Sequence, residues 1–141
     1  MIHAKITSEV ELYMVQSLNT KVDLTMDATS FVGLAKYGQV LIGDKAFEFY
    51  NTKNAQDYIQ IPWEEVDYVV ASVLFKGKWI PRYAIETKKD GTFNFASKDT
   101  KKVLRAMRPY VAYDHMVQAN SFFKVIKRGL LSFGKKKKRS R

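Results

Sequence analysis

The pattern of hydrophobic and polar residues predicts a series of short β-strands over the first half of the chain. Apolar side chains at Val22, Leu24 and Met26 alternate with polar ones, as in a strand that buries one face. The run from Val66 to Leu74 is apolar and rich in β-branched residues, which favours a central strand. The other predicted strands are residues 31–34, 38–42, 46–50 and 58–61. Pro62 and the two acids after it predict one helical turn at residues 62–66.

The next part of the chain predicts a hairpin closed by Asp90-Gly91. Tyr83–Lys88 and Thr92–Ala96 both alternate apolar with polar residues, and Asp-Gly between such runs is typical of a hairpin turn. A two-residue turn would place charges beside aromatic rings. A type I turn with Gly91 as a left-handed bulge residue pairs Thr87 with Phe93 and Ile85 with Phe95, and keeps the apolar side chains on one face. We therefore predict the bulged turn.

Two amphipathic helices are predicted after the hairpin. The first has Ser97 as its N-cap and ends near Arg108, because Pro109 cannot continue a helix. Its apolar stripe consists of Val103, Leu104, Met107, Tyr110 and Val111. The second begins at Ser121. Together these elements predict an α+β fold, a small antiparallel β-barrel or sandwich of about six or seven strands capped by a C-terminal helix.

The predicted domain organisation is one domain with extensions at both ends. Residues 1–13 form an N-terminal arm or extended start, residues 14–113 the domain, residues 114–133 the second amphipathic helix, and residues 134–141 a basic disordered tail. At 141 residues the chain is large enough for an ordinary hydrophobic core.

Composition restricts the possible chemistry and location. The chain has no cysteine, which excludes disulfides and thiolate metal sites and fits an intracellular protein. The longest nearly uncharged apolar run, Tyr68–Phe75, is far shorter than the ~20 residues that span a bilayer. No apolar segment flanked by basic residues occurs at the N-terminus, so we expect no signal peptide and a cytoplasmic location.

The net charge of +10 is concentrated at the C-terminal end. Residues 1–114 carry 15 Lys and Arg against all 14 Asp and Glu, whereas residues 115–141 carry nine Lys and Arg and no acid. The body is therefore nearly neutral, and the tail predicts an anionic partner.

Enzyme chemistry has few candidate residues, and we expect a protein that is not an enzyme and needs no cofactor or metal. His3 and His115 lack acidic or histidine neighbours at metal-ligand spacing. Glu64 and Glu65 are adjacent and are best explained as a solvated helix start. The glycines at positions 33, 38 and 43 match no phosphate-binding loop and are typical of strand turns.

A first candidate binding patch lies between the central strand and the hairpin. Lys76, Lys78, Trp79 and Arg82 interleave basic groups with an indole, a combination that holds phosphorylated head groups, nucleic-acid backbones or acidic protein surfaces. The alternative, which we favour at this point, places Trp79 and Ile80 in the core and leaves the charges to solvate a loop.

A second candidate patch is the C-terminal segment, whose aromatic residues and basic flanks are typical of a helix on an anionic membrane surface. Plain packing against the body explains the pattern equally well. DNA binding is less favoured, because no helix presents a recognition face. The candidate residues are Phe122, Phe123, Lys124, Ile126, Lys127, Arg128, Lys135, Lys136, Lys137, Lys138 and Arg139.

Long stretches of the chain resemble a known family. Short strands with glycine turns, an Ile-Pro-Trp junction, a hairpin and one C-terminal helix are similar to the pleckstrin-homology-like superfold, including its bacterial and GRAM-type members. More closely, the segments MVQSLNTKVDLTMDATSFVGLAKYGQVLIGDKAFEFYN, YIQIPWEEVDYVVASVLFKGKWIPRYAIETKKDGTFNFASKD and SFFKVIKRGL resemble an uncharacterised family of Gram-positive bacteria, sometimes called ManO. Its genes lie beside the mannose-type sugar phosphotransferase operon. The resemblance covers residues 14–131.

The resemblance implies an accessory or regulatory role in mannose-type sugar transport, with membrane components of that phosphotransferase system as partners. It supplies no catalytic or binding residues. Combined with the two candidate patches, it predicts a regulatory protein at the inner membrane face that binds the permease or anionic lipid. The alternative is a transcriptional regulator of the mannose operon that contacts DNA through its basic tail.

Overall fold

The computed structural model describes residues 16–124 and 126–128. The predicted N-terminal arm and the predicted tail from residue 134 lie outside this part of the chain. The strands are β1 (Val22–Ser30), β2 (Lys36–Gly43), β3 (Ala46–Asn51), β4 (Tyr58–Pro62), β5 (Val66–Leu74), β6 (Trp79–Thr87), β7 (Thr92–Ser97) and β8 (Met116–Gln118). The helices are the 3₁₀ turns η1 (Trp63–Glu65), η2 (Phe75–Gly77) and η3 (Tyr113–His115), and the α-helix α2 (Thr100–Met107). Residues 119–124 and 126–128 are also helical.

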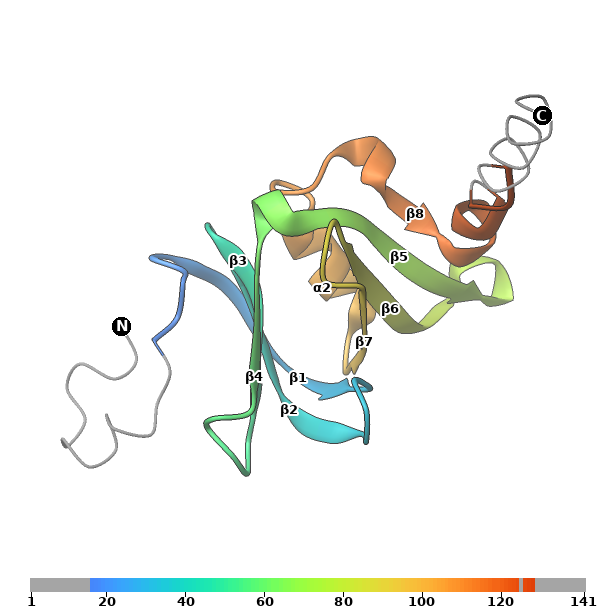
Figure 1. The fold of residues 1–141 in the computed structure, drawn as a ribbon. Coiled ribbons are helices and arrows are strands. Elements are labelled where there is room, and N and C mark those ends of the chain that lie inside the picture. Colours follow the sequence, from blue (N-terminus) through green and yellow to red (C-terminus); the bar gives the residue numbers. More distant parts are fainter. Residues whose placement is uncertain (1–15, 125, 129–141) are drawn as a thin grey trace, which may run out of the picture.

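All eight strands belong to one open sheet with the order β4-β3-β2-β1-β7-β6-β5-β8 (Figure 1). Neighbouring strands are antiparallel except β5 and β8, which are parallel. The predicted α+β class is confirmed. Of the two predicted arrangements, a small barrel or a sandwich, the barrel is wrong, because the sheet is open and has β4 and β8 as its two edges.

One core lies between the two halves of the sheet and α2. Ile42 of β2, Phe47 of β3, Ile85 of β6 and Phe95 of β7 are fully buried in a single cluster. From α2, Val103 and Met107 enter the same cluster, and Leu104 packs partly against it. The predicted apolar stripe of this helix is therefore confirmed, and the sheet curves so that both halves reach α2.

Three sequence predictions about the strands need correction. Residues 31–34 form no strand, because β1 continues to Ser30 and the chain then turns through Gly33 at a φ of 76°. The strand count is eight rather than six or seven. β8 was not predicted, because its three residues have no alternation of their own and depend on pairing with β5.

The hairpin has the predicted face but a different register. Tyr83 pairs with Phe95 and Ile85 with Phe93, two residues from the predicted pairing. A shift of two residues preserves the buried face, which explains why the pattern alone did not exclude it. The extra loop length is closed by Thr87, whose N–H and hydroxyl both donate to the Gly91 carbonyl, at 3.0 and 2.7 Å. Gly91 is left-handed, as predicted, with a φ of 81°.

The N-cap of α2 is Asp99 rather than Ser97. The Asp99 carboxylate accepts the Lys102 N–H at 3.2 Å. Ser97 belongs to β7, and its hydroxyl is engaged with the Tyr83 hydroxyl at 2.8 Å. α2 ends at Met107 with Arg108 as its C-cap, directly before Pro109 as predicted. In the part of the chain that the structure describes, no helix is long and apolar enough to cross a membrane.

Candidate functional site

The connection between β5 and β6, here called the hairpin tip (Leu74–Trp79), has an unusual backbone. Leu74 and Trp79 are the last paired residues of the two strands. Between them Phe75, Lys76 and Gly77 all have positive φ, at 53°, 55° and 90°. Two successive non-glycine residues in the left-handed region cost about 1 kcal/mol or more each. Such strain is found most often where a loop has a function.

Apolar side chains of the hairpin tip are exposed. Phe75 is 69% exposed and Trp79 is 53% exposed, and the two rings stack with centroids 6.1 Å apart at 14°. Leu74 is exposed beside them, and Lys76 and Lys78 are exposed on either side of Gly77. The prediction that Trp79 is a core residue is wrong. Trp79 lies one residue after the turn, where β6 extends beyond the part of the sheet against which other elements pack.

Arg82 differs from the other predicted residues of this patch. It lies on β6 opposite Ser72, and its guanidinium is 4.1 Å from the centroid of the Phe31 ring. A cation over an aromatic face is attracted by the ring quadrupole. Arg82 therefore fastens the β1–β2 connection to β6, and only Lys76, Lys78 and Trp79 of the predicted patch form the hairpin tip.

A polar cavity of about 380 Å³ lies beside the hairpin tip. Lys78, Trp79, Ile80 and Pro81 line one wall, and the residues between β7 and α2, Ser97 to Lys101, line the other. Three lysines, Lys78, Lys98 and Lys101, thus border one hollow that contains a single acid, Asp99. This arrangement attracts anions to the side of the exposed aromatic pair.

The C-terminal helix begins at the same end of the molecule as the hairpin tip. The parallel pairing of β8 with β5 places Gln118 opposite Ala71, three residues before Leu74 (Figure 1). Phe122 packs edge-on against Tyr68 of β5 with centroids 5.5 Å apart. Phe123 and Ile126 are exposed, as are Lys124, Lys127 and Arg128. Residues 135–139 of the predicted patch lie outside the described residues.

Several residues of this surface escaped the sequence interpretation. Phe75, the most exposed aromatic residue of the hairpin tip, was read as part of the apolar run that precedes it. Lys98 and Lys101 are distant in the sequence from Lys78 and come close only through the β6–β7 hairpin. Leu34, which lies in a predicted strand, is 85% exposed in the β1–β2 connection. An apolar residue followed by Lys-Gly-Lys was the only sequence signal available for the tip.

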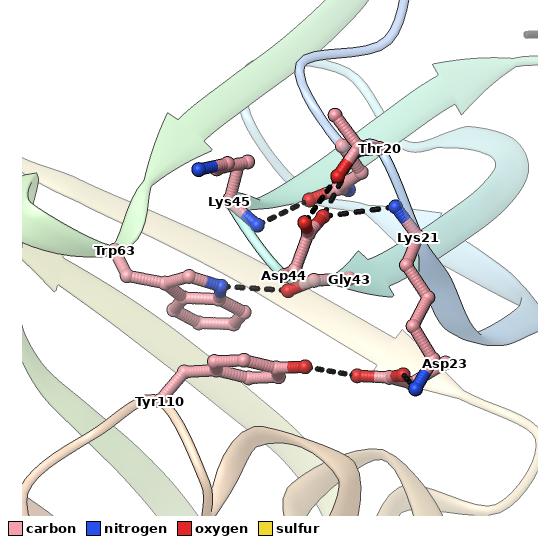
Figure 2. A network of polar contacts seen from close by, with 9 residues as sticks. Thr20, Lys21, Asp23, Gly43, Asp44, Lys45, Trp63 and Tyr110 are labelled. Carbon is pink, nitrogen blue, oxygen red and sulfur yellow. Dashed lines mark hydrogen bonds and ion pairs between the residues drawn. The ribbon is translucent and has the colours of Figure 1, made fainter.

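A second cluster, at the opposite end of β5, is built differently (Figure 2). Trp63 of η1 stacks on Tyr110 with centroids 5.1 Å apart, and its indole N–H donates to the Gly43 carbonyl at 2.8 Å. The Tyr110 hydroxyl donates to the Asp23 carboxylate, which raises the pKa of Tyr110. Hydrogen bonds from the Thr20 hydroxyl and from backbone N–H groups lower the pKa of Asp44 to about 2. The Trp63 indole N–H, the Tyr110 hydroxyl and the carboxylates of Asp23 and Asp44 are thus all engaged within the fold (Figure 2).

The Glu48 side chain of β3 is fully buried, and within the described ranges of the chain it has no basic partner. It accepts hydrogen bonds from the Leu18 N–H at 2.8 Å, the Asn19 amide at 2.9 Å and the Tyr50 hydroxyl at 3.0 Å. The Ser17 hydroxyl at 2.5 Å and the Gln60 amide at 3.1 Å complete five donors. Burial raises the pKa of Tyr50 to about 12, with Glu48 as a further cause. Because all lone pairs are used, Glu48 serves to hold residues 17–19 on β3.

Of the titratable residues considered for enzyme chemistry in the sequence analysis, those within the described part of the chain are His115, Glu64 and Glu65. His115 stacks on Tyr68 at 4.2 Å, and its Nδ1 contacts the Asp67 carbonyl at 2.5 Å. Glu64 and Glu65 are exposed on η1. Among residues 16–124 and 126–128, no group of three His, Cys, Asp or Glu side chains is arranged to hold a metal ion.

The chain belongs to the family defined by a domain of unknown function (DUF956), whose model matches residues 14–130. No curated protein matches the chain. Among solved structures it is similar to the C-terminal domain of an unknown protein from Leishmania infantum, with a TM-score of 0.56 and 15% sequence identity over 64% of this chain and 83% of that one. At this identity the similarity concerns the fold alone.

Proposed function

We propose that this DUF956 family member is a non-enzymatic accessory protein that attaches to the cytoplasmic face of the membrane and modulates a mannose-type sugar phosphotransferase permease there. The observation that carries the membrane part is the exposed, stacked Phe75–Trp79 pair of the hairpin tip, whose intervening residues include the exposed Lys76 and Lys78. The permease part rests on the family resemblance of the sequence.

The hairpin tip has the chemistry of a membrane-interface anchor. Tryptophan and phenylalanine bury well at the boundary between head groups and acyl chains, and lysines beside them remain at the anionic surface. Each lysine near such a surface contributes about 1 kcal/mol at low salt. Lys98 and Lys101 border the cavity next to the tip, and the C-terminal helix, which begins at the same end of the molecule, exposes Phe123 and Ile126.

We also infer that the fold is a variant of the pleckstrin-homology-like superfold. A run of antiparallel strands followed by one helix against the sheet supports this relationship. The inference adds no function, since proteins of this superfold bind lipids, peptides and other proteins.

Flotation with lipid vesicles tests the membrane attachment. Full-length protein is mixed with vesicles of phosphatidylcholine alone or with a large fraction of phosphatidylglycerol. We expect binding to the anionic vesicles, a blue shift of the tryptophan emission, and weaker binding at high salt. Phe75→Ala combined with Trp79→Ala should lower binding at least tenfold. The matched control is Tyr58→Ala, which removes an exposed aromatic ring stacked on Tyr50 at the β4 edge.

Charge and permease dependence are separated in two further arms. Lys76→Gln with Lys78→Gln should weaken binding roughly 10- to 30-fold, at about 1 kcal/mol for each charge; Lys53→Gln, in the exposed β3–β4 loop, should not. Fractionation of cells with and without the permease then tests the partner. If membrane attachment is unchanged in cells without the permease, the permease part of the proposal is contradicted. If the protein does not bind vesicles but binds operator DNA, the transcriptional regulator is supported instead.

A further inference from the structure

An open cavity of about 540 Å³ lies between α2 and the β5–β8 edge of the sheet, apart from the polar cavity at the hairpin tip. Three β5 residues, Val69, Ala71 and Val73, form its floor, and Ile80 of β6 lies at one end. Its other walls come from α2, from the chain that leads to β8, and from β8 itself: Leu104, Arg108, Val111, Tyr113, Met116, Val117 and Gln118.

The cavity follows from the way the helix and the last strand are placed. Leu104 lies on α2, whose Val103 and Met107 enter the core, and Arg108 and Val111 follow the last residue of this helix. β8 has only three residues and pairs with β5 over Val69–Ala71. The floor therefore continues to Val73, past the last β5 residue that pairs with β8.

The lining is apolar with one positive charge. Aliphatic and methionine side chains supply most of the surface, and Arg108 is the only charged residue, with no Asp or Glu in the lining. Within the described part of the chain, the Arg108 guanidinium has no ion pair. Tyr113, which is 96% exposed, borders the same cavity. An apolar hollow with a single free guanidinium is complementary to a molecule with a hydrocarbon body and one anionic group.

We propose that this cavity binds one acyl chain that carries an anionic head group, with the head group at Arg108. The volume is in the range of about 300–1,000 Å³ that small-molecule sites have. Val73 and Ile80, at one end of the cavity, directly adjoin Leu74 and Trp79 of the hairpin tip. The cavity thus extends inward from the base of the tip. The chain is supplied either as a free fatty acid or by an anionic membrane lipid.

The test uses the full chain and a fluorescent fatty acid, 11-(dansylamino)undecanoic acid, displaced by dodecanoate, dodecyl phosphate or uncharged dodecanol. We expect dodecanoate and dodecyl phosphate to displace the probe at lower concentrations than dodecanol. Arg108→Gln should weaken dodecanoate about tenfold, as loss of a hydrogen bond to a charged group does, and leave dodecanol unchanged. Arg105→Gln, exposed on the same helix but outside the lining, is the matched control and should change neither.

Two filling variants keep the proposal testable if one of them does not fold. Ala71→Phe places a ring on the cavity floor and should abolish displacement by all three ligands, with circular dichroism as the folding check. Ile80→Trp, at the half-buried end of the cavity, should do the same. The proposal is overturned if no ligand displaces the probe below its solubility limit, or if Arg105→Gln and Arg108→Gln weaken dodecanoate equally. It is also overturned if binding appears only in a chain truncated after Arg128, because the chain's own C-terminal segment then fills the cavity.

Failure of this site and failure of the membrane anchor are distinguishable. Phe75→Ala with Trp79→Ala should lose vesicles but retain dodecanoate, whereas Ala71→Phe should lose dodecanoate but retain vesicles. Vesicles that contain phosphatidylglycerol with a fluorophore on its acyl chain identify the source. If the fluorescence of the labelled lipid changes with wild-type protein but not with Ala71→Phe, the bound acyl chain belongs to a membrane lipid. If dodecanoate binds but the fluorescence of the labelled lipid does not change, the ligand is the free fatty acid.

Discussion

The two tryptophans of this chain lie at opposite ends of β5, and each is stacked on another aromatic ring. Trp63 and Tyr110 have their centroids 5.1 Å apart with an interplanar angle of 9°, and Phe75 and Trp79 have theirs 6.1 Å apart at 14°. The ring geometries are close, but the surroundings are not. Trp63 is half-buried against the core, whereas Trp79 and Phe75 extend from the hairpin tip.

The difference lies in the polar atoms and in the backbone. The Trp63 indole donates to Gly43 and the Tyr110 hydroxyl donates to Asp23, so this pair ties η1 and the turn after α2 to β2 and β1 (Figure 2). Among the described residues, the Trp79 indole N–H has no hydrogen-bond partner, and its loop contains two left-handed non-glycine residues. One pair stabilises the fold, and the other is held exposed at a conformational cost, which favours a role in binding.

The largest expected effect separates the two tryptophans by stability. Trp63→Ala should lower the free energy of unfolding by about 2–3 kcal/mol, because the stack on Tyr110 and the hydrogen bond to Gly43 are both lost. This loss is smaller than for a fully buried tryptophan, because Trp63 is only half-buried. Trp79→Ala should change it by less than about 0.5 kcal/mol. Urea denaturation of both variants measures this, and equal losses would remove the distinction between the two ends.

Glycine-to-alanine substitutions at Gly43, near Trp63, and at Gly77, in the hairpin tip, should both lower the free energy of unfolding, but for different reasons. A Cβ at Gly43 would lie 2.3 Å from the Lys21 carbonyl oxygen and 2.5 Å from the Asn19 side chain, so Gly43→Ala should cost about 2 kcal/mol. A Cβ at Gly77 meets nothing within 4 Å, and only the φ of 90° opposes it, so Gly77→Ala should cost about 1 kcal/mol. A larger loss at Gly77 than at Gly43 in thermal or urea unfolding would contradict this.

Relief of the backbone strain at the hairpin tip should stabilise the protein. Lys76→Gly replaces a residue at φ 55° and should add about 0.5 kcal/mol, the strain removed exceeding the entropy that glycine adds to the unfolded chain. Lys78→Gly is the matched control, since Lys78 has an ordinary helical conformation with φ −72°, and it should destabilise slightly. If Lys76→Gly also destabilises, the tip is not strained.

The smallest expected effect is the loss of stability at acid pH that Asp44, near the Trp63–Tyr110 pair, should cause. The folded pKa of Asp44 is lowered to about 2 from 3.8, chiefly by the Thr20 hydroxyl. A depressed carboxyl pKa contributes stability that is complete above the unfolded value and is lost as the pH falls through the folded one. Unfolding measured between pH 5 and pH 2 should therefore show a shallower loss in Asp44→Asn than in the wild type. Parallel curves would show that Asp44 is not coupled to folding.

The elements of the fold were largely predictable, but several of their connections were not. β5 and the apolar stripe of α2 follow from local pattern, because burial of one face imposes a period on the sequence. The hairpin register differed by two residues, since such a shift keeps the same face buried. The N-cap of α2 is Asp99 and not the predicted Ser97, because the Ser97 hydroxyl is hydrogen-bonded to Tyr83, which is distant in the sequence.

The candidate site was predictable from the sequence only in part. Lys76, Lys78 and Trp79 were visible as a mixture of charge and indole. Whether Trp79 is buried depends on how far β6 extends beyond the rest of the sheet, which no local pattern reports. Phe75 was hidden in an apolar run, and Lys98 is brought to the tip only by the β6–β7 hairpin.

The sequence by itself determined the α+β class, most strand and helix positions and the uneven distribution of charge, because periodicity and composition are local quantities. The tertiary structure alone decided that the sheet stays open, that a three-residue strand completes it, and that α2 leaves a cavity above β5. It also decided which tryptophan anchors the fold and which is exposed. Those outcomes depend on the packing of segments that are far apart in the chain. Such contacts produce no repeating hydrophobic pattern in the sequence of either segment.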